Sequence, residues 1–231
     1  ALARITSAAE AARSRGGDAF AALCGGQCTN EAAYVLHKLA HSVFSSTNID
    51  STDLAERRVA DDALAAILGS AAATNTRQDL AAADVILVVG SNLTESNPVL
   101  SLTVIKAIRQ GKKVIVVDPR STELAQRAAF HLAVKPGADV SVLRVFLGHI
   151  AASGLEDAAF LAGRTEGATQ VLEALRAVDV EAEALVAGVD PEHVRAAAEA
   201  YGRAGAAAII YGSGVTGGST AAQEVSLLAD L

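Results

Sequence analysis

The sequence has 231 residues, of which 51% are apolar and 19% are charged, and its net charge is −7. This composition excludes a disordered polyampholyte and a small protein that depends on disulfides for its stability. Aromatic residues make up 3% and no basic cluster occurs, which argues against nucleic-acid binding. The apolar runs are much shorter than the roughly 18 residues of a membrane-spanning helix, so no direct membrane insertion is expected.

The first residue, the cysteines and the histidines set further expectations. The sequence contains no Met and begins at Ala1, so we expect it to be a fragment of a larger chain. Cys24 and Cys28 cannot complete a four-ligand zinc site by themselves, and the five histidines are scattered. The sequence therefore predicts no metal site, and its few cysteines are typical of a reduced, cytoplasmic setting.

The first part of the chain shows mainly helical patterns. Small or apolar residues recur at helical spacing, and glycines or polar turns interrupt them. The expected elements are, in order, a helix over 1–15, a strand over 18–24, a helix over 31–44, polar turns over 45–53 and a helix over 54–68.

The central part predicts a parallel sheet. Continuous apolar runs alternate with helical patterns, which is typical of strands that are covered by helices on both faces. The expected elements are strands over 84–90, 113–117 and 130–134 and helices over 99–109 and 121–129. Helical patterns follow over 139–152, 155–186 and 190–203, and a last strand over 206–211 leads into a glycine-rich turn over 212–218 and a helix over 220–231.

Polar residues and glycines follow the central strands, where ligands bind in such sheets. Gly90, Asn92 and Glu95 follow the first run, and Asp118 and Arg120 follow the second, which ends at Val117. An acid at a strand end can bind a ribose or a base, and an arginine can bind a phosphate. Each turn also has a simpler explanation, as an ordinary connection or a surface ion pair.

Two further turns are candidates of the same kind. Gly137 and Asp139 follow the third run, although Asp139 also suits the start of the next helix. The glycine-rich segment 212–218 lies between a strand and a helix, where backbone amides can bind an anion. It lacks the Gly-Lys-Ser/Thr sequence of a phosphate-binding loop, so alone it is a weak signal.

The order of several segments extends this interpretation. CTNEAAYVLHKLA, STNID, TNTRQDLAAADVILVVGSNLTESNPV, KVIVVDPRSTELA, HLAVKPGADVSVL, RTEG and AIIYGSGVTGG follow one another along nearly the whole chain. This pattern resembles the molybdopterin oxidoreductase superfamily. The most similar members are the formate dehydrogenase alpha subunit and the large iron–sulfur subunit of NADH–quinone oxidoreductase (complex I).

The resemblance implies a fold and a cofactor. The fold would be α/β, with parallel sheets layered by helices as in formate dehydrogenase and DMSO reductase. Residues 1–50 and 186–231 would form one discontinuous domain, and 51–185 an inserted Rossmann-like domain. Gly90, Asn92, Glu95, Val117, Asp118, Arg120, Gly137 and Asp139 would contact one nucleotide arm of molybdopterin guanine dinucleotide. Iron–sulfur clusters would belong only to a part of the parent chain before Ala1.

One departure from the family pattern concerns the metal ligand. Counting without gaps from Asn48 places Glu56 and Arg57 where formate dehydrogenases carry a cysteine or selenocysteine ligand to molybdenum and a histidine. An exposed charge pair explains these residues more simply than a carboxylate ligand does. Their presence therefore predicts that the molybdenum ligand is lost and that the fragment itself is not catalytic.

These observations lead to three readings of function. The first is a structural molybdopterin-like domain in the large subunit of an NADH dehydrogenase complex. The alternative is a catalytic, molybdopterin-dependent formate dehydrogenase alpha subunit, and a further alternative is a nucleotide-binding module without redox chemistry. The first two imply partner subunits, a cytoplasmic location and, through the complex, a peripheral position on the inner face of the cell membrane.

Overall fold

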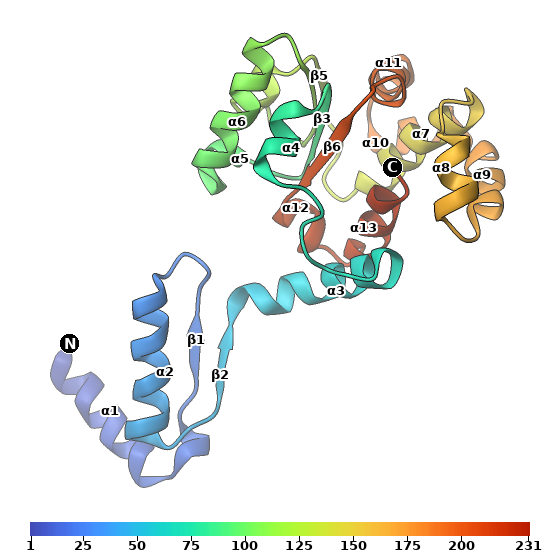
Figure 1. The fold of residues 1–231 in the computed structure, drawn as a ribbon. Coiled ribbons are helices and arrows are strands. Elements are labelled where there is room, and N and C mark those ends of the chain that lie inside the picture. Colours follow the sequence, from blue (N-terminus) through green and yellow to red (C-terminus); the bar gives the residue numbers. More distant parts are fainter. The chain divides into compact units, whose positions relative to one another are not determined.

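The computed structural model describes residues 1–231, apart from the side chains of Asp53, Ala55 and Glu56. The chain divides into two compact units, Ala1–Arg58 and Val59–Leu231. The division falls inside helix α3 (Thr52–Leu68). Figure 1 shows the elements of both units.

The first unit contains two helices and a two-stranded parallel sheet, in which Ala22 lies opposite Ile49. Its elements are α1 (Leu2–Ser14), a 3₁₀ turn (Gly17–Ala19), β1 (Ala22–Cys24), α2 (Asn30–Phe44) and β2 (Ile49–Ser51). Thr29 caps α2, since its hydroxyl accepts a hydrogen bond from the Ala32 amide at 3.2 Å. The strand β2 lies in a segment predicted as turns, because only pairing with β1 makes it extended.

The second unit is built on a four-stranded sheet in the order β5-β4-β3-β6, with every pair parallel. The strands are β3 (Val85–Val89), β4 (Lys113–Val117), β5 (Phe130–Leu132) and β6 (Ala207–Tyr211). This arrangement confirms the predicted α/β fold class with a parallel sheet. The strand β6 lies beside β3 although it comes last in the chain.

Helices cover both faces of this sheet. Alternate residues of each strand point to opposite faces, so successive side chains pack against different helices. Ile86 and Val88 pack on one side with side chains of α4 (Arg77–Ala82) and α6 (Pro98–Arg109). Leu87 and Val89 pack on the other with α7 (Asp139–Ala152), α11 (Pro191–Gly202) and α13 (Ala221–Ala229). Figure 1 shows these two layers of helices on the sheet. The apolar runs are continuous because each strand has two buried faces.

The remaining helices of this unit are short. They are α5 (Leu93–Ser96), α8 (Ala158–Arg164), α9 (Ala168–Arg176), α10 (Val180–Ala187) and α12 (Ser213–Thr216). Two predictions are corrected here. Residues 121–129 contain only a 3₁₀ turn (Ala125–Arg127) in place of the predicted helix, and the predicted glycine-rich turn at 212–218 contains α12.

The compact units have other boundaries than the predicted domains. Residues 186–231 lie in the same unit as the central strands, because β6 pairs with β3. The division into residues 1–50 with 186–231 and an inserted domain of 51–185 stays a prediction for the parent chain.

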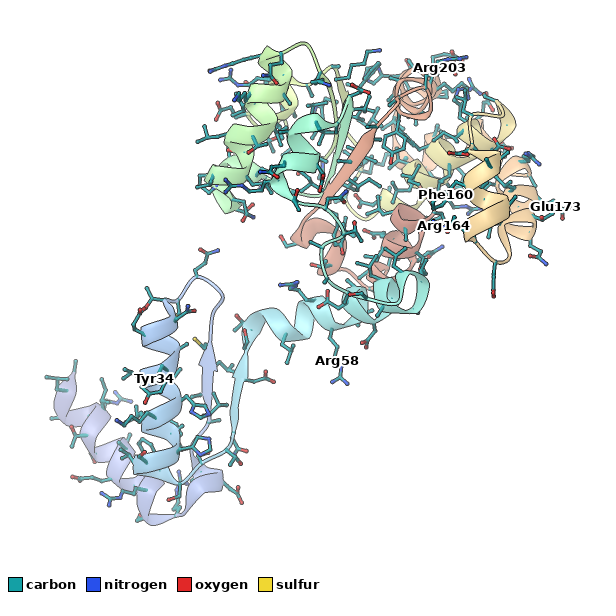
Figure 2. All side chains as sticks on the ribbon, viewed as in Figure 1. Tyr34, Arg58, Phe160, Arg164, Glu173 and Arg203 are labelled. Carbon is teal, nitrogen blue, oxygen red and sulfur yellow. The ribbon has the colours of Figure 1, made fainter. Side chains whose placement is uncertain are left out.

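Large apolar side chains also occur on the surface. Tyr34 of α2 and Phe160 of α8 are 64% and 54% exposed, and both are labelled in Figure 2. Within the described part of the chain, no helix is long and apolar enough to cross a membrane.

Candidate functional site

The carboxyl ends of β3 and β4 form one edge of the sheet. Val89 lies opposite Val117, and the amide of Gly90 donates to the carbonyl oxygen of Val117 at 2.9 Å. Because the two strands are parallel and in register, the turns that follow them start side by side. The polar residues of both turns can therefore contribute to one site.

These two turns enclose a cavity of about 430 Å³. Its lining side chains are all polar: Asn92, Thr94, Glu95, Arg120, Ser121, Thr122 and Glu123. The cavity brings together three of the predicted residues, Asn92, Glu95 and Arg120. The set offers a guanidinium for an anion, and carboxylate, amide and hydroxyl groups for hydrogen-bond donors.

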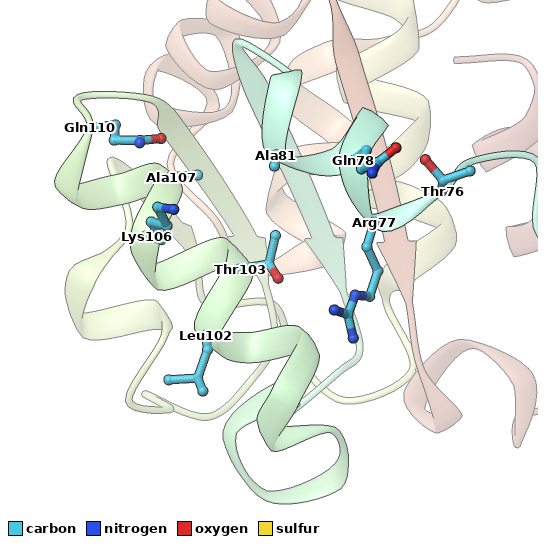
Figure 3. A pocket seen from close by; sticks show the side chains of 9 residues that line it. All are labelled: Thr76, Arg77, Gln78, Ala81, Leu102, Thr103, Lys106, Ala107 and Gln110. Atoms are coloured by element: carbon cyan, nitrogen blue, oxygen red, sulfur yellow. The ribbon is translucent and has the colours of Figure 1, made fainter.

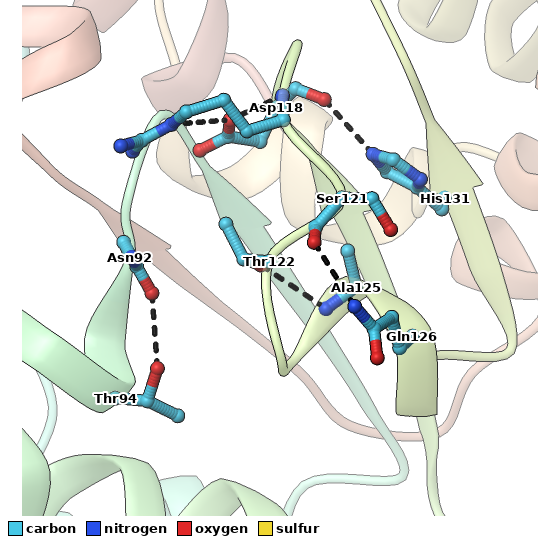
Figure 4. A network of polar contacts seen from close by, with 9 residues as sticks. Asn92, Thr94, Asp118, Ser121, Thr122, Ala125, Gln126 and His131 are labelled. Carbon is cyan, nitrogen blue, oxygen red and sulfur yellow. Dashed lines mark hydrogen bonds and ion pairs between the residues drawn. The ribbon is translucent and has the colours of Figure 1, made fainter.

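Asp118 holds in place the turn after β4 that carries Arg120. Its side chain is buried, and its Oδ1 accepts hydrogen bonds from the Arg120 amide at 2.8 Å and from Arg120 Nε at 3.4 Å. His131 Nε2 lies 2.9 Å from the Asp118 carbonyl oxygen, as Figure 4 shows, so it donates there in the Nε2–H form. The side chain of Arg120 is 65% exposed, so its outer nitrogens remain accessible to a ligand.

Local hydrogen bonds also hold other residues that line the cavity. The Thr94 hydroxyl donates to Asn92 Oδ1 at 3.0 Å, and the Thr122 hydroxyl accepts from the Ala125 amide at 3.2 Å (Figure 4). The second contact joins Thr122 to the start of the 3₁₀ turn Ala125–Arg127. These lining residues are thus held by hydrogen bonds within their own turns, without a ligand.

The loop after β6 lies against the loop after β3. Gly212 donates to the Val89 carbonyl oxygen at 3.1 Å and Gly214 to the Gly90 carbonyl oxygen at 3.0 Å. A Cβ atom on Gly212 would lie 2.7 Å from that Gly90 oxygen, which is closer than real side chains approach. Gly90 itself has a φ of +55°, which favours glycine. The glycines therefore serve close backbone packing at the sheet edge.

Two buried carboxyl groups lie near this edge. Burial raises the pKa of Asp139, at the first turn of α7, and the charge of Asp118 raises it further. Burial also raises the pKa of Glu224, on α13, and the charge of Asp139 adds to the shift while a hydrogen bond from Thr220 opposes it. One Glu224 oxygen, Oε2, is buried without a hydrogen-bond partner.

Sequence analysis did not single out Glu224. The available signal was its position on a helix face shared with Ala221, Val225 and Leu228, all of which are buried. An acid in such a stripe is exceptional, because burying a carboxyl group costs free energy.

Other predicted site residues lie outside the cavity. Gly90, Asp118, Gly137 and Asp139 are not among its lining residues. The side chain of Val117 belongs to the core, and its carbonyl oxygen already accepts a hydrogen bond from Gly90. Any contact of Val117 with a ligand would therefore require other backbone atoms or a displaced hydrogen bond.

The predicted metal-ligand position cannot be placed at this edge. The side chain of Glu56 lies outside the described residues, and its neighbour Arg57 is exposed. Among the side chains that the structure describes, no group of three or more His, Cys, Asp or Glu residues is arranged to hold a metal ion.

A family comparison identifies the chain. The model of the molybdopterin oxidoreductase family matches residues 1–231. The chain belongs to the molybdopterin oxidoreductase family. This confirms the resemblance on which the cofactor prediction depends.

Two curated relatives are formate dehydrogenases. The F420-dependent formate dehydrogenase 1 subunit alpha of Methanococcus maripaludis is 34% identical over 89% of this chain and 30% of its own length. Formate dehydrogenase H of Escherichia coli is 35% identical over 81% of this chain and 26% of its own length. The chain thus spans less than a third of these relatives.

A solved structure has the same fold. Acetylene hydratase from Pelobacter acetylenicus matches 98% of this chain and 30% of its own chain, with a TM-score of 0.71 and 19% sequence identity. At that identity, the likeness concerns the fold alone.

Proposed function

We propose that this chain is the part of a formate dehydrogenase-type alpha subunit that binds the nucleotide arm of a molybdopterin cofactor. The observation that carries the proposal is the polar cavity where β3 and β4 end, lined by Asn92, Glu95 and Arg120. The formate dehydrogenase relatives support this alternative over the complex I reading. Partner subunits and a cytoplasmic location belong to the same proposal.

The donor set of the cavity fits a guanosine phosphate. Arg120 is anchored through Nε and has its outer nitrogens free for phosphate oxygens. The carboxylate of Glu95 and the amide of Asn92 can bind the N–H and O–H groups of a base or a ribose. When bound, the molybdopterin group would supply the two-electron redox chemistry of the enzyme.

This chain's own residues bind and orient in that arrangement. Asp118 positions Arg120 because it accepts hydrogen bonds from both the amide and Nε of that residue. Gly90 and Gly214 let the two loops approach, which closes the edge of the sheet beside the cavity. Gly137 and Asp139 stay proposed contacts from the family resemblance.

The test is the effect of GDP on the melting temperature of the full chain, since a ligand that binds only the native state stabilises it. We expect GDP to raise the melting temperature of the wild type and to have much less effect on Arg120→Gln. Arg203→Gln is the matched control, because Arg203 is an exposed arginine with its own acidic partner, Glu199. No shift in the wild type, or equal shifts in both variants, would refute the proposed site.

A second candidate function is supported by the sequence around Glu56. If Glu56 and Arg57 replace the metal ligand and its neighbour, the same domain would be a structural part of an NADH dehydrogenase complex, without molybdenum. Molybdenum analysis of the full-length subunit, purified from its own host, separates the two. Stoichiometric molybdenum supports the formate dehydrogenase type. A subunit that contains pterin but no molybdenum supports the second candidate.

A further inference from the structure

A second cavity, of about 660 Å³, lies between α4 and α6. Arg77 and Gln78 of α4 line one side, and Leu102, Thr103, Lys106 and Gln110 line the other. Figure 3 shows Arg77 projecting from α4 and Lys106 from α6. This groove shares no lining residue with the strand-end cavity, so it is a separate feature.

The groove carries two cationic side chains, Arg77 and Lys106. Among the described side chains, neither Arg77 nor Lys106 forms an ion pair, whereas nearby Lys112 pairs with Asp84 at 2.8 Å. The acid of α4, Asp79, is bound by the amide and hydroxyl of Thr76 at 2.8 and 2.7 Å. In a chain of net charge −7, unpaired cations facing one groove favour an anionic ligand.

Apolar surface lies beside these cations. Leu102, which lines the groove, is 64% exposed, and Val99, about one turn earlier on α6, is 62% exposed. A small inorganic anion gains nothing from Leu102, whereas a peptide can bury an apolar side chain against it. The combination therefore favours a protein segment over a free ion.

The spacing on α6 suits such a segment. Thr103 and Lys106 lie on one face of α6, and Gln110, which directly follows the helix, continues the same spacing. From the first to the last of them the face extends for about 10 Å, at roughly 1.5 Å per residue. We propose that the groove between α4 and α6 docks an acidic segment of a partner protein that also carries an apolar side chain.

The test measures binding of a fluorescein-labelled peptide in which glutamates flank a leucine, by anisotropy, with the full chain. We expect the double variant Arg77→Gln/Lys106→Gln to bind about fivefold or more weakly, because each exposed ion pair contributes modestly. Added salt should also weaken binding by the wild type. Leu102→Ser should weaken binding as well, independently of salt.

Arg109→Gln is the matched control, because Arg109 is exposed on the same helix but does not line the groove. It should bind the peptide as the wild type does. The proposal fails if the wild type does not bind the peptide, if a glutamine version binds equally, or if Arg109→Gln weakens binding as much as the double variant. It also fails if inorganic phosphate displaces the peptide while Leu102→Ser has no effect, since the groove then binds a simple anion.

Discussion

Gly90 and Gly214 lie with their backbones against each other, at the edge where β3 and β6 end. The amide of Gly214 donates to the Gly90 carbonyl oxygen at 3.0 Å, and a Cβ atom on Gly214 would lie 2.8 Å from the Gly90 Cα. The two loops come from distant parts of the chain, yet they meet without room for a side chain. The strand-end cavity lies beside this junction and depends on the same loop after β3.

Replacing Gly214 with alanine should destabilise the fold. The added methyl group would press on the Gly90 backbone, and such overpacking costs about 1–3 kcal/mol. Urea denaturation should show this loss in the free energy of unfolding. Gly218→Ala is the control, because its Cβ would lie 3.6 Å or more from other atoms. Equal stability of the two variants would contradict the close packing.

Asp118→Ala should lower the stability of the fold and loosen the turn that carries Arg120. It removes the acceptor of the Arg120 amide and Nε; because Arg120 is exposed, water replaces part of these contacts, and the expected cost is about 1 kcal/mol. Asp118→Asn keeps an oxygen at that position and should cost less. Thermal denaturation of both variants checks this order, and an alanine variant more stable than the asparagine variant would contradict it.

The stability difference between Glu224→Gln and the wild type should depend on pH. Burial raises the pKa of Glu224 above its ordinary value of 4.5, so the native state binds more protons than the unfolded state between the two values. The wild type therefore loses stability from this group as the pH rises through that interval. The glutamine variant avoids this loss of stability. It also keeps a side-chain oxygen that can accept the hydrogen bond of the Thr220 hydroxyl, which in the wild type lies 2.6 Å from Glu224 Oε1.

Urea titrations at several pH values measure this effect. The free energy of unfolding of Glu224→Gln should exceed that of the wild type most at neutral pH, and this difference should shrink as the pH falls toward 4.5. Glu173→Gln serves as the control, since Glu173 is an exposed acid on α9 (Figure 2). A gain that grows with acidity would show that the sign is wrong.

Leu87→Ala should be among the most damaging single changes in the second unit. Leu87 is fully buried at the centre of β3, and removing such a side chain leaves a cavity that costs about 2–5 kcal/mol. Leu185→Ala makes the same change at a residue that is 76% exposed, so it should cost little. Guanidinium denaturation compares the two, and similar losses would argue against the proposed core.

Part of the candidate site was predictable from the sequence. Asn92 and Arg120 each follow an apolar run, and parallel strands carry such positions to one edge, so their meeting in a cavity follows from the pattern. Glu224 was missed because burial of an acid is decided by the elements that cover it. The helix predicted over 121–129 failed because that segment forms only a 3₁₀ turn, which helical spacing alone does not reveal.

The sequence alone determined the local and familial features of this protein: continuous apolar strands, a parallel α/β class and the ordered motifs of its family. These are set by neighbours in the chain, through side-chain spacing and turn chemistry. Only the tertiary structure decided that β6 lies beside β3, that Gly214 meets Gly90 and that Arg77 and Lys106 share a groove. Such contacts join residues far apart in the chain, and their free energy comes from the packing of whole layers, which no local pattern encodes.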